Sequence, residues 1–341
     1  MIRTEPTKTI NPAIQGLRGA AALAVMLVHV HFMALNGGLT KLSGPAWIED
    51  LGPYAVMLFF CISGYLITST LSRHGDVRRF AVNRVARIYP VFGLLHLVMF
   101  TAGPFMNYEW MGALRGDPLA WAGHFVSNLL FLPGIFDLPI AQKNTWSLSY
   151  EAWFYLVAGL LSAGLRRRWT LPGMILSGLA LLMISVVAWR EVKVVFFAVG
   201  ALVWWGRRRG LLNAPPLAGI LGVLGCVGGF SLYCHGHYLL SAAAALVFFA
   251  GLATNCGFLA RVLSTPPLLW LGKVSYSLYL LHPFVLDVLR RLCVKMATHF
   301  PGVPSLAVFW GAGIIAVLLA SAACHALVEV RLTRFCFPRR G

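Results

Sequence analysis

Long apolar runs, separated by short segments rich in arginine, dominate the hydrophobic pattern of this chain. An α-helix needs about 20 predominantly apolar residues to cross a bilayer, and most of the runs are close to that length. An additional apolar stretch at 124–136 is too short to cross and is predicted to be interfacial or re-entrant. We predict ten spans, at 12–34, 53–72, 88–105, 146–164, 171–190, 192–206, 214–233, 237–256, 267–289 and 304–328. The pattern therefore predicts an all-α polytopic membrane protein.

The basic residues give these spans a direction. They gather at alternate ends of the apolar runs, and cytoplasmic loops of membrane proteins carry such an excess of lysine and arginine. Ten crossings return both termini to one side, which the arginines predict to be the cytoplasmic side. The basic clusters comprise Arg73, Arg78, Arg79, Arg84 and Arg87, residues 166–168 and 207–209, and the arginines from 331 onward.

Composition excludes a soluble protein. Hydrophobic residues make up 59% of the 341 positions and charged residues 11%, whereas an average soluble domain has about 25% charged residues. The net charge of +17 follows the span ends, so we assign it to topology and to contact with anionic membrane lipids rather than to nucleic acid. Almost no length remains outside the spans. We therefore expect one transmembrane domain over 1–341, with no appended soluble domain.

The seven cysteines do not form a metal site in the sequence. Most fall inside apolar runs, and they show neither a CxxC pair nor any other metal-ligand spacing. We read them as small core residues and predict no bound metal.

Ionisable residues inside the spans are the candidates for chemistry, because burying them in a membrane is costly. Arg18 and His29 are eleven residues apart, which places them on one face of the first helix, about 16 Å apart along its axis. Glu151 lies in the segment NTWSLSYEAWFYL, which Asn144 or Thr145 would cap. Counted from the outer ends of their helices, His29 and Glu151 reach a similar depth, about 8–9 Å.

A histidine oriented by a buried carboxylate is the arrangement that a general base requires. We therefore predict His29 and Glu151 as the catalytic pair. The alternative stays open, since a single transmembrane histidine often only hydrogen-bonds a neighbouring helix. His282, which also lies in the outer half of its span, is the substitute for His29.

Two further groups of residues are candidates for binding. Arg84 and Arg87 in FAVNRVARIYP are three residues apart at a helix start, a spacing that suits a phosphate-rich ligand, although topology alone would also explain them. For the substrate we select residues near Glu151 and in a later span, namely Trp146, Ser147, Tyr150 and His282.

Five segments together resemble the membrane-bound acyltransferase family 3, which includes bacterial O-acetyltransferases of surface glycans. They are IQGLRGAAALAVMLVHVHF, LFFCISGYLIT, FAVNRVARIYP, NTWSLSYEAWFYL and LGKVSYSLYLLHPF, and they occur in the family's order between residues 14 and 284. One position departs from the family. Many relatives carry an acidic residue just before the FFxISG segment, where this chain has Val56, Met57 and Leu58.

The resemblance implies an acyltransferase with ten membrane helices in the bacterial inner membrane. Acyl-CoA, most simply acetyl-CoA, would be the donor substrate, and a carbohydrate or glycolipid on the extracytoplasmic side would be the acceptor. The family's Arg-x10-His corresponds to Arg18 and His29, its Arg-x-x-Arg to Arg84 and Arg87, and its acidic residue to Glu151. The resemblance thus implies that the donor is bound by Arg18, Arg84 and Arg87, and that acyl transfer is catalysed by His29 and Glu151.

Two other functions fit the intramembrane charges. A transporter or flippase for a lipid-linked glycan would also need them, although the sequence shows no internal repeat of the kind that many transporters carry. A non-catalytic subunit of a polysaccharide-synthesis complex is the second alternative. The oligomeric state stays open, with a homodimer as one option.

Overall fold

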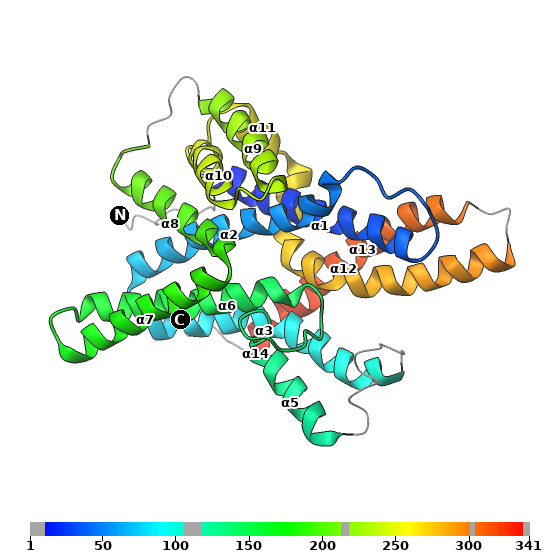
Figure 1. The fold of residues 1–341 in the computed structure, drawn as a ribbon, viewed down its shortest axis with the longest axis horizontal. Coiled ribbons are helices and arrows are strands. Elements are labelled where there is room, and N and C mark those ends of the chain that lie inside the picture. The colour runs from blue at the N-terminus through cyan, green and yellow to red at the C-terminus, as the bar shows by residue number, and fades with distance from the viewer. Residues whose placement is uncertain (1–10, 106–116, 213–217, 301–303, 337–341) are drawn as a thin grey trace, which may run out of the picture. The chain divides into compact units, whose positions relative to one another are not determined.

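The fold is helical, as the apolar pattern predicts. The computed structural model describes residues 11–105, 117–212, 218–300 and 304–336, and no strand occurs in these segments (Figure 1). The longer helices are α1 (Pro12–Asn36), α2 (Trp47–His74), α3 (Val77–Ala102), α6 (Thr145–Arg166), α7 (Leu171–Arg190), α8 (Val195–Arg208), α9 (Ala218–Cys234), α10 (Tyr238–Ala253), α12 (Pro266–His299) and α13 (Ser305–Cys324).

Shorter elements complete the chain. They are the helices α5 (Pro118–Leu129), α11 (Gly257–Leu263) and α14 (Thr333–Cys336), the 3-10 turns η1 (Gly103–Phe105) and η2 (Val192–Val194), and the π-helical segment η3 (His325–Leu332). At twelve residues α5 is too short to cross a bilayer, as expected for the stretch that begins at 124.

Each of the ten predicted spans coincides with a helix. Within the described residues, six helices are long and apolar enough to cross a membrane, and the bent pair α10 and α11, which meet at 71°, would make a seventh. The other helices fall short for different reasons. The helices α8 and α9 have 14 and 17 residues, and α12 carries several charged side chains along its 34 residues. The multi-pass helical class is confirmed, while the count of ten crossings and the side of the termini stay predictions.

One helix starts far earlier than predicted. The apolar pattern predicts a start at 88, but α3 begins at Val77, so the basic segment that contains Arg84 is helical. Asp76 is the cause, because its carboxylate accepts a hydrogen bond from the backbone N–H of Arg79 at 3.0 Å and so caps the first turn. Helical capping does not depend on apolarity, and this explains why the hydrophobic pattern missed the first eleven residues.

The chain folds as two compact units, each built from segments that are separated in the sequence. Of the described residues, the first unit contains 11–28, 44–66, 195–212 and 218–275. Its helices approach through glycines: a Cβ added at Gly64 would lie 2.0 Å from the Phe197 carbonyl oxygen, and one at Gly200 would lie 1.8 Å from that of Cys61. Small residues of this kind let membrane helices pack backbone to backbone. The prediction of a single domain is not tested by this division.

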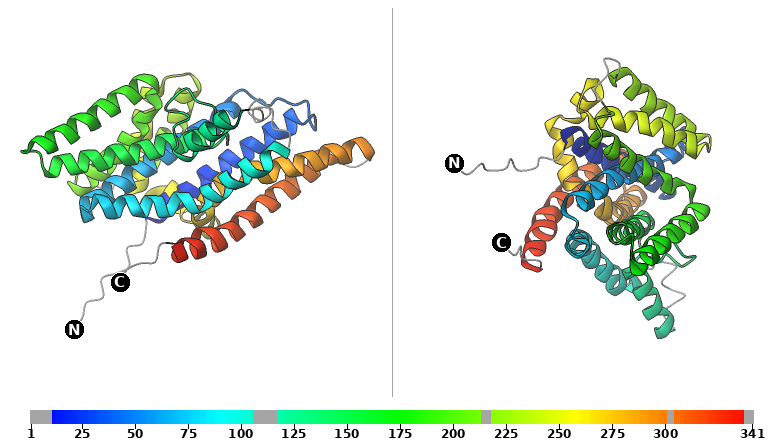
Figure 2. Two further views of the ribbon diagram at one scale, coloured as in Figure 1. Left: turned by 90° about the horizontal axis from the view of Figure 1, so that it is seen from below. Right: turned by 90° about the vertical axis from the view of Figure 1, so that its left-hand side faces the viewer.

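Of the described residues, the second unit contains 29–43, 67–105, 117–194, 276–300 and 304–336. In this unit α6 and α7 form an antiparallel hairpin, and α6 also packs along α3 (Figure 2). The helices α12 and α13 touch where Leu286 faces Gly313. The segment after α13 returns to α3, where the Thr333 hydroxyl donates to the Ala86 carbonyl at 3.4 Å. That carbonyl lacks its usual helical donor because residue 90 is a proline.

Candidate active site

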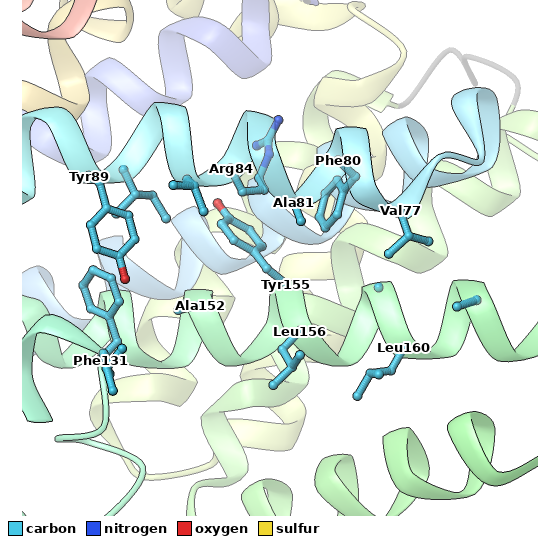
Figure 3. A pocket seen from close by; sticks show the side chains of 15 residues that line it. Val77, Phe80, Ala81, Arg84, Tyr89, Phe131, Ala152, Tyr155, Leu156 and Leu160 are labelled. Carbon is cyan, nitrogen blue, oxygen red and sulfur yellow. The ribbon is translucent and has the colours of Figure 1, made fainter. Parts of the chain in front are cut away.

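A groove between α3 and α6 runs through the second unit. It has a volume of about 330 Å³ and is lined mainly by apolar side chains, with Arg84 as the one cation among the described residues that line it (Figure 3). Its lining extends along α3 from Val77 to Tyr89, which corresponds to about 18 Å of helix. Tyr89 and Phe131 close one end, with their ring centroids 5.8 Å apart. The groove is long and narrow and therefore suits a linear, mostly apolar group.

Arg84 is held in this groove by two aromatic rings. Its guanidinium carbon lies 5.6 Å from the ring centroid of Phe80 and 5.6 Å from that of Tyr155, which reaches from α6 toward α3. The Nε of Arg84 is buried and has no hydrogen-bond partner among the described residues. A cation oriented by stacking and left with an unused donor is suited to an anionic ligand.

Tyr155 connects this arginine to Glu151. Its hydroxyl donates to Oε1 of Glu151, one turn earlier on α6, while its ring supports Arg84. Glu151 is partly buried, and its charge acts on Arg87, three residues after Arg84 on α3. A carboxylate, a phenol and two guanidinium groups therefore gather where α3 and α6 meet.

The two arginines have different surroundings. Arg87 does not line the groove, and its charge is balanced by Glu151 and by Glu329 of η3. Glu329 in turn accepts hydrogen bonds from the Ser277 hydroxyl at 2.9 Å and from Nδ1 of His325 at 3.0 Å. Arg87 is thus part of an internal charge network, whereas Arg84 faces the groove. The Arg-x-x-Arg spacing alone did not separate these roles.

His29 of α1 packs against His282 of α12. Their ring centroids are 4.9 Å apart and the ring planes meet at 61°, an edge-to-face contact. His282 is fully buried, with its Nδ1 2.9 Å from the Leu278 carbonyl oxygen and its Nε2 3.3 Å from Nδ2 of Asn144. Among the contacts of these two residues, His29 packs against His282 and Glu151 accepts from Tyr155. Their pairing as base and orienting carboxylate stays a prediction.

Asn144 does not have the capping role expected for it. It stands at the N-cap position of α6 but makes no side-chain cap hydrogen bond. Its amide instead donates to the Tyr279 carbonyl at 2.9 Å and approaches His282. The Tyr279 carbonyl needs a donor because residue 283, four positions later, is a proline without an N–H. Pairing with α12 therefore replaces capping.

The remaining predicted substrate residues lie near the start of α6. Ser147 is buried, and its hydroxyl lies 2.7 Å from that of Tyr279. Trp146 and Tyr150 are partly exposed and form an edge-to-face pair with centroids 6.2 Å apart. Such an exposed aromatic pair has the apolar faces that a sugar ring can cover.

Arg18 belongs to the first unit, where it ties α1 to α12. Its guanidinium donates to the Ser275 hydroxyl at 3.1 Å and to the Gln15 side-chain oxygen at 3.5 Å. The structure thus gives Arg18 an interhelical contact, and its predicted donor role is not tested.

Sequence reasoning missed Tyr155, Tyr279, Glu329 and the pairing of Asn144 with α12. Only one of these had a usable signal. A proline inside a membrane helix leaves the carbonyl four residues earlier without a donor, so Pro283 pointed to a polar partner for Tyr279. Which residue supplies that partner depends on helix packing, which has no local signature.

The helices, the groove and the intramembrane histidines together define a multi-pass membrane protein with an internal polar site. The family model described as an acyltransferase domain, that of acyltransferase family 3, matches residues 11–325. This chain therefore belongs to that acyltransferase family, as its five sequence segments indicated. No solved structure is matched by the chain.

Curated relatives carry related names. The chain is 26% identical over 324 residues to the peptidoglycan O-acetyltransferase OatA of Listeria monocytogenes, covering 82% of this chain and 50% of the relative. It is 28% identical over 317 residues to YrhL of Bacillus subtilis, provisionally named a peptidoglycan O-acetyltransferase, covering 80% of this chain and 48% of the relative. The chain thus spans about half the length of the curated relatives it matches.

Proposed function

We propose that this protein is an integral membrane O-acyltransferase of the bacterial inner membrane. It takes an acyl group, most simply acetyl, from acyl-CoA on the cytoplasmic side and transfers it to a hydroxyl of a carbohydrate on the extracytoplasmic side. The observation that carries the proposal is Arg84, whose stacked guanidinium has an unused Nε donor in a long apolar groove.

The groove suits the two parts of an acyl-CoA. Arg84 offers a charge-assisted hydrogen bond to a phosphate, and the apolar walls accept the linear arm that carries the thioester. One end of the groove, lined by Val77 and Ala163, lies beside basic clusters at 78–79 and 166–168. The positive-inside rule makes this end cytoplasmic, the side on which acyl-CoA is found.

The transfer would use His29 as the base. His29 removes the proton from the acceptor hydroxyl while the hydroxyl oxygen attacks the carbonyl carbon of the thioester. The carbon–sulfur bond breaks, the new carbon–oxygen bond forms an ester, and the imidazolium of His29 returns the proton to the leaving thiolate. In the two-step alternative, a ring nitrogen of His29 attacks the thioester carbonyl, the carbon–sulfur bond breaks, and the ring proton goes to the leaving thiolate. The acceptor hydroxyl then attacks the acyl-histidine, and its proton goes to the ring nitrogen that is released.

The acceptor is proposed to be a glycan presented at the start of α6. Trp146 and Tyr150 offer partly exposed aromatic faces near the N-terminal end of that helix. The named relatives act on peptidoglycan or are provisionally assigned to it. A polysaccharide of peptidoglycan type is therefore the first acceptor to test.

The experiment compares two arginines of the same helix. Arg84→Ala removes the groove cation, whereas Arg78→Ala removes an exposed arginine that does not line the groove. A charge-assisted contact contributes about 1.5–3 kcal/mol, so Arg84→Ala should weaken binding of acetyl-CoA to the purified protein roughly tenfold to a hundredfold. Calorimetric titration at low and high salt measures it, and Arg78→Ala should bind like the wild type.

Acyl transfer is then assayed with the same protein. Acetyl transfer from acetyl-CoA to a peptidoglycan fragment, lost in His29→Ala, supports the enzyme. A protein that neither binds nor consumes acetyl-CoA, and whose Arg84→Ala and Arg78→Ala variants behave alike, would contradict the proposal. The transporter or the non-catalytic subunit would then be the better assignment.

A further inference from the structure

His282 is the fully buried imidazole that touches His29, and its own hydrogen bonds fix its chemical state. The Leu278 carbonyl oxygen can only accept, so Nδ1, 2.9 Å away, must carry the proton and donate it. In a neutral ring the other nitrogen then has no hydrogen and must accept.

Asn144 supplies the donor that this tautomer requires. Its side-chain nitrogen lies 2.9 Å from the Tyr279 carbonyl oxygen, which identifies that atom as the NH2 group. One hydrogen goes to this carbonyl and the other points to Nε2 of His282, 3.3 Å away. A second proton on His282 would face the hydrogen of this amide. The amide therefore selects the neutral ring with its proton on Nδ1.

Pro283 explains why Asn144 is held in this orientation. With any other residue at position 283, the backbone N–H of that residue would donate to the Tyr279 carbonyl. Because proline has no N–H, this carbonyl accepts a hydrogen bond from the Asn144 amide instead. The dipeptide His282-Pro283 thus carries both the ring and the proline whose missing N–H leaves the Tyr279 carbonyl to Asn144. We call the arrangement of Asn144, the Tyr279 carbonyl and His282 the amide lock.

We propose that His282 is a positioning residue for His29, and that the amide lock holds it in that role. This inference rests on the proposed function, in which His29 is the base. Because both ring nitrogens of His282 are engaged, it has no lone pair left for the acceptor hydroxyl and does not serve as a second base. Its fixed ring instead supports the ring of His29, with the centroids 4.9 Å apart, at one orientation.

Kinetics separate this role from a merely structural one. Asn144→Leu should lower kcat about tenfold to a hundredfold, the cost of misplacing a reacting group by about 1 Å, with the KM for acetyl-CoA unchanged. His282→Phe, which keeps a ring but no hydrogen bonds, should also lower kcat yet stay more active than His29→Ala. The double variant Asn144→Leu/His282→Phe should be no worse than the poorer single variant, because both act through one lock.

A second double variant isolates the folding contribution. In Asn144→Leu/Pro283→Ala, the restored N–H satisfies the Tyr279 carbonyl, so thermal stability should recover while kcat stays low. Thr145→Val is the matched control, because it removes a buried hydroxyl next to Asn144 that donates to the Gln142 carbonyl and not to His282, and it should keep the wild-type kcat. Recovery of kcat together with stability in Asn144→Leu/Pro283→Ala would overturn the proposal. So would a His282→Phe variant as inactive as His29→Ala.

A spectroscopic measurement tests the lock without any activity. Nitrogen NMR of the full chain with 15N-labelled histidine, in which His282 is assigned from its loss in His282→Phe, reports which ring nitrogen carries the proton. The wild type should show only the Nδ1–H tautomer, and Asn144→Leu should show a mixture. An Nε2–H tautomer in the wild type would overturn the lock even if transfer occurs. A fully active His29→Ala variant would instead show that His29 is not the base in the proposed function. It would not change the tautomer that NMR finds for His282.

Discussion

Tyr155 donates a hydrogen bond to Glu151 from one turn further along α6, and its ring lies beneath the guanidinium of Arg84. One side chain therefore touches both the groove cation and the candidate catalytic carboxylate. Burying a polar or charged group without its partner in a membrane interior costs free energy, so the loss of these contacts should be measurable. This contact leads to the first prediction.

Replacing Tyr155 with Phe separates the two contacts. The ring stays under Arg84, so binding of acetyl-CoA should change little. Glu151 loses the hydrogen bond from the Tyr155 hydroxyl, and a hydrogen bond to a charged acceptor contributes about 1.5–3 kcal/mol. We therefore expect kcat to fall by about tenfold or more. Tyr155→Leu should in addition weaken donor binding, because it removes the ring. Equal kcat in Tyr155→Phe and the wild type would show that the hydroxyl does not serve the reaction.

His29 and Glu151 should act as one unit. His29→Ala should abolish acetyl transfer while leaving folding and donor binding intact, and Glu151→Gln should slow transfer strongly. If the two groups cooperate, the double variant should be little worse than His29→Ala alone, as for other catalytic groups that work together. Transfer rates of the three variants under single-turnover conditions measure this. Fully additive losses would show that the two residues work independently.

Arg87 should matter for stability more than for donor binding. Its charge balances Glu151 and Glu329, so Arg87→Ala leaves two carboxylates with less compensation. Breaking a buried charge pair from one side destabilises on the order of 3 kcal/mol, and thermal unfolding in detergent should show the loss. Adding Glu329→Gln should restore part of the stability. If Arg87→Ala weakened acetyl-CoA binding as much as Arg84→Ala does, Arg87 would instead be a residue that binds the donor.

The topology follows from the basic clusters and can be tested directly. The positive-inside rule places both termini and the loops near Arg78, Arg167 and Arg208 in the cytoplasm. Reporter fusions or accessibility of single introduced cysteines at these positions should report the cytoplasmic side. An extracytoplasmic signal at position 167 would require a different number of crossings before it.

Gly272 in the LGKVSYS segment should not tolerate a side chain. A Cβ there would lie 2.1 Å from the Gln15 carbonyl oxygen of α1, and one at Gly19 would lie 2.7 Å from the Gly272 nitrogen. Gly272→Ala should therefore cost about 1–3 kcal/mol of stability, the usual cost of overpacking. Gly311→Ala in α13 is the control, since its Cβ would meet nothing within 4 Å, and it should be neutral. Melting temperatures of the two variants decide.

The sequence by itself determined the class of this protein and the residue types of its site. Apolar runs of bilayer length dictate helices, because a backbone in lipid must satisfy its own hydrogen bonds. The costly ionisable residues within those runs pointed to His29 and Glu151, and the spacing of Arg84 and Arg87 pointed to a site for an anion. Five segments in order identified the family. These features are local or periodic, so they can be read along one chain.

Only the tertiary structure decided which of these residues meet. A spacing of three residues is the same in every helix, yet Arg84 lines a groove, whereas the charge of Arg87 interacts with the carboxylates of Glu151 and Glu329. His29 and Glu151 have matching predicted depths, but depth leaves the direction around each helix open, and only the packing shows that His29 contacts His282. Asn144 has the residue type of a cap and pairs with α12 instead, because Pro283 left a carbonyl vacant there. Helix rotation and packing settle such partners, and no local pattern encodes them.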